Sequence, residues 1–167
     1  MVIQYTEMQM PEFSFPRPMT RLVHENFSVI MAYAFSRKPP ERHMERFTGE
    51  WKYLRMALFD IAEEKAARAC LEMALFLRLV DDEHHISKYY EQTGCRYFGR
   101  TVLKNNKVEK LTLRQVCNKI IHAKGLSWDF SDEANPILIC LSQDGQNWVR
   151  AEVNLFELSC LCGQIMS

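Results

Sequence analysis

The feature that most constrains the fold is the stretch ALFDIAEEKAARACLEMALFLRLV, residues 57–80, which is dense in strong helix formers. Its second half is apolar on most sides, as expected of a helix that other elements surround. Arg68, Glu72 and Arg78 interrupt the most apolar part, residues 66–80, so the stretch lacks the composition of a membrane span. It predicts a long central helix in a helical bundle, within a helical region that starts near Glu41.

A first helix is predicted before that region. Apolar residues recur at three- and four-residue steps from Val23 to Ala34, which is the spacing of one helix face. Thr20 is a suitable N-cap, and Pro39 and Pro40 cannot continue a helix. We therefore expect a helix that begins near Thr20 and ends before Pro39.

Strands are predicted mainly near the C-terminus. The segment PILICLSQDGQNWVRAEVNL has two β-favouring runs around Asp144–Gly145, which predicts a β-hairpin at about 137–154. A short closing helix follows it. The turn signal at Asn105–Asn106 fits either a second hairpin or a loop. The predicted fold class is mainly α, a helical bundle with a long central helix plus a small β-hairpin near the C-terminus.

Length and composition predict one domain with an N-terminal arm. A chain of 167 residues is long enough to bury a substantial core. Three prolines before Met19 forbid a regular helix, so residues 1–19 are predicted as an extended arm and residues 20–167 as a single domain. The 21 basic and 21 acidic residues balance, so any contact with nucleic acid requires a local basic patch.

The sequence also bears on compartment and metal content. The N-terminus lacks the basic start and the apolar run of a secretory signal, so we expect a cytoplasmic protein that does not enter a membrane. Six cysteines are then expected as thiols, with Cys70, Cys117 and Cys140 as small buried hydrophobes. Their spacing is poor for zinc, and neither a metal nor another cofactor is expected.

The candidate site lies in TLRQVCNKIIHAKG, residues 112–125. With Thr112 as N-cap, a helix here has a core face that includes Cys117. Arg114, Asn118 and His122 are four residues apart and form a slanted stripe on another side, because each step of four rotates only about 40°. A histidine can act as general acid or base, an arginine can stabilise phosphate charge, and an asparagine can orient the histidine.

A purely structural interpretation explains the same residues. Histidine is favoured near a helix C-terminus by the helix dipole, and Gly125 is a natural C-cap nearby. Asparagine and arginine are common on protein surfaces, and a three-residue stripe arises easily at helical spacing.

The heptapeptide CNKIIHA, residues 117–123, resembles the signature of the HEPN (higher eukaryotes and prokaryotes nucleotide-binding) superfamily. The family motif is an arginine, four to six residues and a histidine, and a common form reads Arg-Asn-Lys-Ile-x-His followed by a small residue. Five residues match that form in place: Asn118, Lys119, Ile120, His122 and Ala123. Cys117 stands where the family has its arginine, and a neutral thiol cannot replace the phosphate contact of a guanidinium.

The resemblance implies a helical domain that pairs as a homodimer, with both motifs facing one cleft. Active members of the family are mostly metal-independent endoribonucleases of toxin–antitoxin and antiviral defence systems. Carried onto this chain, His122 is the acid–base residue, Asn118 its orienter and Arg114 the anion stabiliser. The missing arginine favours instead a non-catalytic module that binds RNA, a nucleotide or a protein.

A third hypothesis is an unrelated metal protein that uses His84, His85 and the acidic run Asp81–Glu83. Adjacent residues on a helix point about 100° apart, so the two histidines are poorly placed to share one metal. The run is more typical of a solvated helix end.

Overall fold

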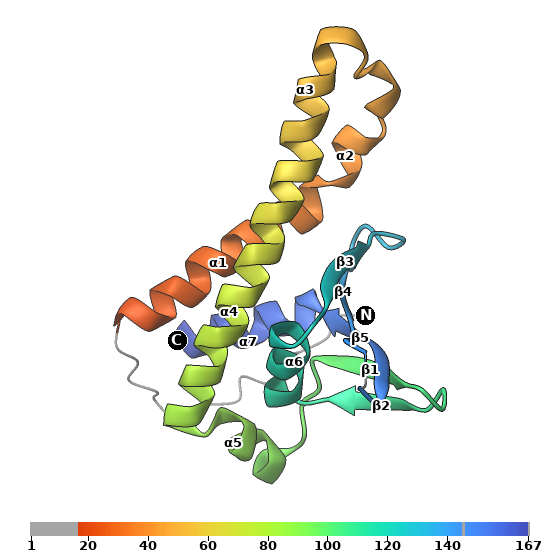
Figure 1. Cartoon of the computed structure of the whole chain (residues 1–167). Helices are drawn as coiled ribbons and strands as arrows, with labels where there is room; N and C mark the ends of the chain where they lie inside the picture. Colours follow the sequence, from red (N-terminus) through yellow and green to blue (C-terminus); the bar gives the residue numbers. More distant parts are fainter. Residues whose placement is uncertain (1–16, 145, 167) are drawn as a thin grey trace, which may run out of the picture.

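The computed structural model describes residues 17–144 and 146–166. Its N-terminal half is helical, and its C-terminal half combines a sheet with two helices (Figure 1). The helical half contains α1 (Arg17–Ser36), α2 (Lys38–Glu41), η1 (Met44–Arg46), η2 (Gly49–Trp51), α3 (Lys52–Arg55), η3 (Met56–Ile61), α4 (Ala62–His84) and α5 (Ile86–Thr93). The rest contains β1 (Gly99–Leu103), β2 (Val108–Leu111), α6 (Leu113–Ile121), β3 (Gly125–Asp129), β4 (Ile137–Leu141), β5 (Trp148–Asn154) and α7 (Leu155–Met166).

The long helix expected over residues 57–80 is present and longer than expected. α3, the π-helical turn η3 and α4 follow one another without a break and form one rod. The upper part of this rod, with α2 beside it, extends beyond the rest of the molecule (Figure 1). Gly49 has a φ of 59° and lies where the chain turns into the rod.

The predicted fold class is wrong, because the chain contains a five-stranded antiparallel sheet and not only a small hairpin. The strand order is β2-β1-β5-β4-β3. β4 and β5 pair as the expected hairpin, although its tip residue Gly145 lies outside the described residues. β1 and β2 form a second hairpin, and Gly99 of β1 pairs with Val153 of β5. The expected hairpin of β4 and β5 is therefore the inner part of a larger sheet, and β1, β2 and β3 are its other strands.

The sheet topology fixes the place of α6. β2 and β3 are the two edge strands, and α6 is the segment that connects them. A helix that joins opposite edges of a sheet must cross one of its faces. α6 accordingly contacts both β5 and α4, and it lies between α4 and the sheet in Figure 1.

The core lies between α4 and the elements around it. α1 packs along α4, and the buried face of α4 includes Cys70, Met73 and Leu77. The inward side of the sheet contributes Leu138 and Val153, which are fully buried. Among the described residues, no helix is long and apolar enough to cross a membrane.

The boundary of the predicted arm also needs correction. α1 begins at Arg17 and not near Thr20. Pro18 is compatible with this start, because the first turn of a helix has no internal acceptors for its N–H groups. Residues 17–19 are therefore helical, and the rest of the arm predicted for residues 1–19 lies outside the described residues.

Candidate functional site

The helix α6 begins as the sequence predicts. Thr112 is the N-cap, and a capping box joins it to Gln115, whose side-chain oxygen accepts a hydrogen bond from the Thr112 backbone N–H at 2.9 Å. The buried face of the helix comprises Leu113, Val116, Cys117 and Ile120. This face anchors α6 in the core, so its polar residues are held at fixed positions on the other sides.

His122 is the C-cap of α6 and is exposed. Its backbone N–H donates to the carbonyl of Asn118 at 3.0 Å, which completes the last turn. Two residues later the Lys124 N–H donates to the Leu141 carbonyl at 2.9 Å and joins the chain to the sheet. The backbone of His122 is thus fixed from both sides, whereas its imidazole makes no hydrogen bond to the residues that the structure describes.

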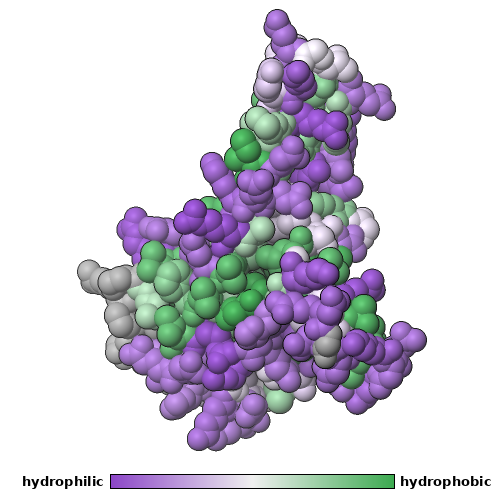
Figure 2. Space-filling model, in the orientation of Figure 1, coloured by the Kyte–Doolittle hydropathy of each residue, from purple (hydrophilic) through white to green (hydrophobic). Residues whose placement is uncertain are grey.

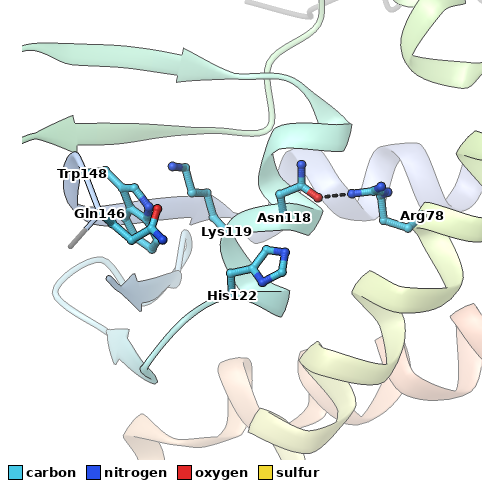
Figure 3. Close-up of a pocket in the computed structure, with 6 residues that line it drawn as sticks. All are labelled: Arg78, Asn118, Lys119, His122, Gln146 and Trp148. Atoms are coloured by element: carbon cyan, nitrogen blue, oxygen red, sulfur yellow. Dashed lines mark hydrogen bonds between the residues drawn. The ribbon is translucent and has the colours of Figure 1, made fainter. Parts of the chain in front are cut away.

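Asn118 lies beside an arginine that the sequence did not associate with it. Nη1 of Arg78, on α4, donates a hydrogen bond to the side-chain oxygen of Asn118 (Figure 3). The imidazole of His122 lies one turn further along α6, toward α4 in the same view. Arg78, Asn118 and His122 therefore form one polar group across the α4–α6 contact.

Arg114, the third member of the predicted stripe, lies away from this group. Its Nη1 contacts Asp82 Oδ1 at 2.5 Å and Asp81 Oδ2 at 3.2 Å. Hydrogen bonds to these two carboxylates raise the pKa of Arg114. Asp81 is 3% exposed and also accepts a hydrogen bond from the Ser87 backbone N–H at 2.6 Å. Arg114 therefore fastens α6 to the end of α4.

Lys119 and Trp148 form the other side of the site. The Lys119 ammonium lies 4.2 Å from the centroid of the Trp148 ring, within the range of a cation–π contact. Burial lowers the pKa of Lys119. Trp148 is 3% exposed, so its ring packs inward and no free ring face is left for stacking.

These residues line an open pocket of about 500 Å³, a size that accommodates a small ligand. Its lining residues are Arg78, Asn118, Lys119, His122, Gln146 and Trp148 (Figure 3). The lining contains an arginine, a lysine, a histidine and two amides, and it contains no carboxylate. The sequence predicted Asn118 and His122, and it did not identify Arg78, Lys119, Gln146 or Trp148 as partners. One sequence feature could have identified Arg78 as a site residue, because it is a charged residue within the apolar half of the central helix.

Cys117 cannot take part in this pocket. It is 1% exposed and belongs to the core, as do Cys70 and Cys140, which confirms the expectation of buried thiols. Burial raises the pKa of Cys117 to about 12, so the thiol is neutral near pH 7. The position at which the resemblance expects an arginine is therefore a packing position in this fold.

The acidic run at the end of α4 has a structural role in the chain. Asp81 and Asp82 hold Arg114, and the Nε2 atom of His84 lies 3.7 Å from a carboxylate oxygen of Glu83. His85 adopts the left-handed conformation, with φ of 56°, where α4 ends and α5 begins. Within residues 17–144 and 146–166, no group of three or more histidine, cysteine or acidic side chains has a metal-binding arrangement.

The chain matches no protein-family model, no curated protein and no solved structure. Only the geometry and charge of the pocket therefore bear on what it binds.

Proposed function

We propose that the pocket binds a phosphate group of RNA or of a nucleotide, and that the chain is a HEPN-like binding module. The observation that carries the proposal is the composition of the pocket, in which Arg78 and Lys119 face solvent space with no carboxylate in the lining. Neither cation has an acidic side chain within 4.0 Å among the described residues, whereas Arg114 has two. An anion is the ligand that such a lining favours.

The chemistry of each side chain fits a phosphate. A guanidinium has several N–H donors in a planar fork, so Arg78 can hold Asn118 with one donor and a phosphate oxygen with others. The Asn118 amide group can donate to a second oxygen while its carbonyl oxygen orients the arginine. Arg78 thus supplies from α4 the positive charge that the resemblance expects at position 117.

The six unpaired cysteines suit a reducing compartment, and we place the protein in the cytoplasm, where RNA is abundant.

The number of cations sets the expected salt dependence. If Arg78 and protonated Lys119 each neutralise a phosphate of a single strand, the slope of log K against log salt is about −1.4. This is a shallow slope, which agrees with a chain whose net charge is +0.

The test is fluorescence anisotropy with a 5′-labelled oligouridylate, over a range of salt concentrations. Arg78→Ala should weaken binding by about ten- to a hundredfold, because a hydrogen bond to a charged group is lost, and should reduce the slope by about 0.7. Arg114→Ala is the matched control, since it removes an arginine from the same helix pair that does not line the pocket, and circular dichroism checks that the variant is folded. Equal losses in the two variants, or no binding by the wild type, would contradict the proposal.

Competition by AMP and by inorganic phosphate separates the possible sources of the phosphate. If AMP displaces the oligonucleotide at concentrations where phosphate does not, the pocket recognises a nucleotide. If neither does so, while the oligonucleotide still requires Arg78, the ligand is an RNA chain. Displacement by phosphate as effectively as by AMP would show an anion site without nucleotide preference and would overturn the assignment to RNA or nucleotides.

The second candidate function is a metal-independent endoribonuclease, and it is favoured by the position of His122 beside the Arg78–Asn118 pair. In this version His122 takes the proton of the attacking 2′-hydroxyl or donates one to the leaving oxygen. Arg78, in place of Arg114, stabilises the charge on the phosphate. It ranks second because cleavage of a phosphodiester needs both a base and an acid, and one copy of the pocket contains a single histidine. Cleavage of single-stranded RNA in EDTA that disappears in His122→Ala would support it.

A further inference from the structure

The pocket contains many more hydrogen-bond donors than acceptors. An arginine has five N–H donors, and Arg78 gives one of them to Asn118. The Nε atom of Arg78 is buried and has no hydrogen-bond partner among the residues that the structure describes. The Lys119 ammonium, which has three donors, lies against the face of the Trp148 ring and not against an acceptor. The lining therefore favours a ligand with several acceptor oxygens.

The two cations of the pocket are placed so that one ligand group can lie between them. In Figure 3 Arg78 lies on one side and Lys119 on the other, with Asn118 between them. No carboxylate lines the pocket, so no acidic side chain of the lining neutralises the two charges. Burial lowers the pKa of Lys119, and a bound anion would oppose this shift because it favours the charged ammonium.

We propose that the pocket takes a phosphate monoester, such as the phosphate at the end of an RNA strand, in preference to an internal phosphodiester. This inference rests on the proposed phosphate-binding function. A phosphate monoester carries about −1.5 to −2 charge at pH 7 and has three strong acceptor oxygens. An internal phosphodiester carries a single charge and has only two unesterified oxygens. The monoester can therefore balance both cations and accept hydrogen bonds from Arg78, Asn118 and Lys119.

The pocket offers little to a nucleobase. Trp148 is 3% exposed, and the other lining residues are polar. Exposed apolar side chains, such as Leu75 and Leu79 of α4, do not line it. Figure 2 shows exposed apolar surface as the green area at left centre, over α1 and the C-terminal half of α4. The state of the phosphate, more than the base, is thus the feature that the pocket can distinguish.

The test is fluorescence anisotropy with a short oligouridylate that is labelled at its 3′ end and has a 5′-phosphate, a 5′-methyl phosphate or a 5′-hydroxyl. The methyl ester lacks one charge and one free oxygen, so this comparison isolates the features of a monoester. If the 5′ end is bound, the wild type should bind the 5′-phosphate about tenfold more tightly than the methyl ester, which makes one fewer charge-assisted hydrogen bond. A second set, labelled at the 5′ end, compares a 3′-phosphate with a 3′-hydroxyl and shows whether the 3′ end is bound instead.

Two variants connect the preference to the pocket. Lys119→Gln should remove most of the preference for the terminal phosphate, because only one cation then remains to balance the second charge. Lys124→Gln is the matched control, since it removes an exposed lysine that does not line the pocket, and it should leave the preference unchanged. Circular dichroism checks that both variants are folded.

The outcomes separate this inference from the phosphate-binding function itself. Equal binding of all the probes would overturn the preference for a monoester, and a loss of that binding in Arg78→Ala would show that the pocket holds internal phosphates. If no probe binds, the function and the inference both fall. A preference that survives both Arg78→Ala and Lys119→Gln would place the terminal phosphate elsewhere on the protein and would also overturn the inference.

Discussion

The substitution Cys117→Arg tests whether phosphate binding depends on an arginine at the motif position or on the pocket that contains Arg78. The HEPN resemblance expects an arginine at position 117. If the motif alone determined function, adding this arginine would restore phosphate binding or catalysis. In the structure Cys117 lies on the buried face of α6 with 1% of its surface exposed. An arginine there points into the core and away from the pocket.

The cost of this change follows from charge and volume. A buried guanidinium without a full set of partners costs about 3–5 kcal/mol. The excess volume costs about 1–3 kcal/mol more. Asp81 is near enough to influence Cys117, but Ser87 and Arg114 already use its oxygens. The two costs together come to about 4–8 kcal/mol. A domain of this size is stable by about 5–15 kcal/mol, so the variant should lose a large part of its stability and should unfold if the wild type lies at the lower end of that range.

The assay is urea unfolding, followed by circular dichroism, with Cys117→Ala as the matched control. The alanine variant should lose about 1 kcal/mol, because it removes one sulfur atom from the core. Cys117→Arg should lose several times as much and should not bind oligouridylate more tightly than the wild type. A folded Cys117→Arg protein with wild-type stability and tighter RNA binding would refute both the burial argument and the role given to Arg78.

Three further predictions concern the core, the junction of α4 with α6, and the sheet. The folded protein should lose stability at alkaline pH because four of its thiols are buried. In the unfolded chain a thiol releases its proton near pH 9, whereas in the folded protein burial raises the pKa of one of them, Cys117, to about 12. Cys117→Ala should therefore lose about 1.4 kcal/mol less than the wild type between pH 8 and pH 10, measured by urea unfolding. Asp81→Asn should cost about 1–3 kcal/mol by the same method, because Ser87 and Arg114 lose a charged acceptor. Gly99→Ala should lower the urea midpoint, since its Cβ would lie 2.3 Å from a backbone oxygen of β5.

Local patterns predicted the elements whose signals lie within a few residues of each other. The N-cap at Thr112, the buried position of Cys117 and the hairpin of β4 and β5 are examples. Each depends on helical or alternating spacing, or on a turn, and each is stabilised largely by its own neighbours. This is why the sequence indicated them without knowledge of the rest of the fold.

The strands β1 and β2 had a weaker local signal, a turn at Asn105–Asn106 that fitted a loop as well as a hairpin. β2 is VEKL, and three of its four residues are exposed, so it has no apolar run to detect. β1 depends on β5, with Gly99 paired to Val153 more than fifty residues later. Strands that become stable only through distant pairing are difficult to infer from composition, which explains why the predicted helical bundle was wrong.

The pocket illustrates the same limit with electrostatics. Arg78 and Arg114 both lie at the contact of α4 with α6, and the sequence favoured Arg114 because it shares a helix with His122. Asp81 and Asp82 reverse that choice, because they neutralise Arg114 and leave Arg78 as the cation beside Asn118. In a chain with equal numbers of acidic and basic residues, an anion site arises where carboxylates are absent. The acidic residues, which the sequence suggested as a solvated helix end or as metal ligands, thus decide which of the two arginines has no carboxylate partner among the described residues.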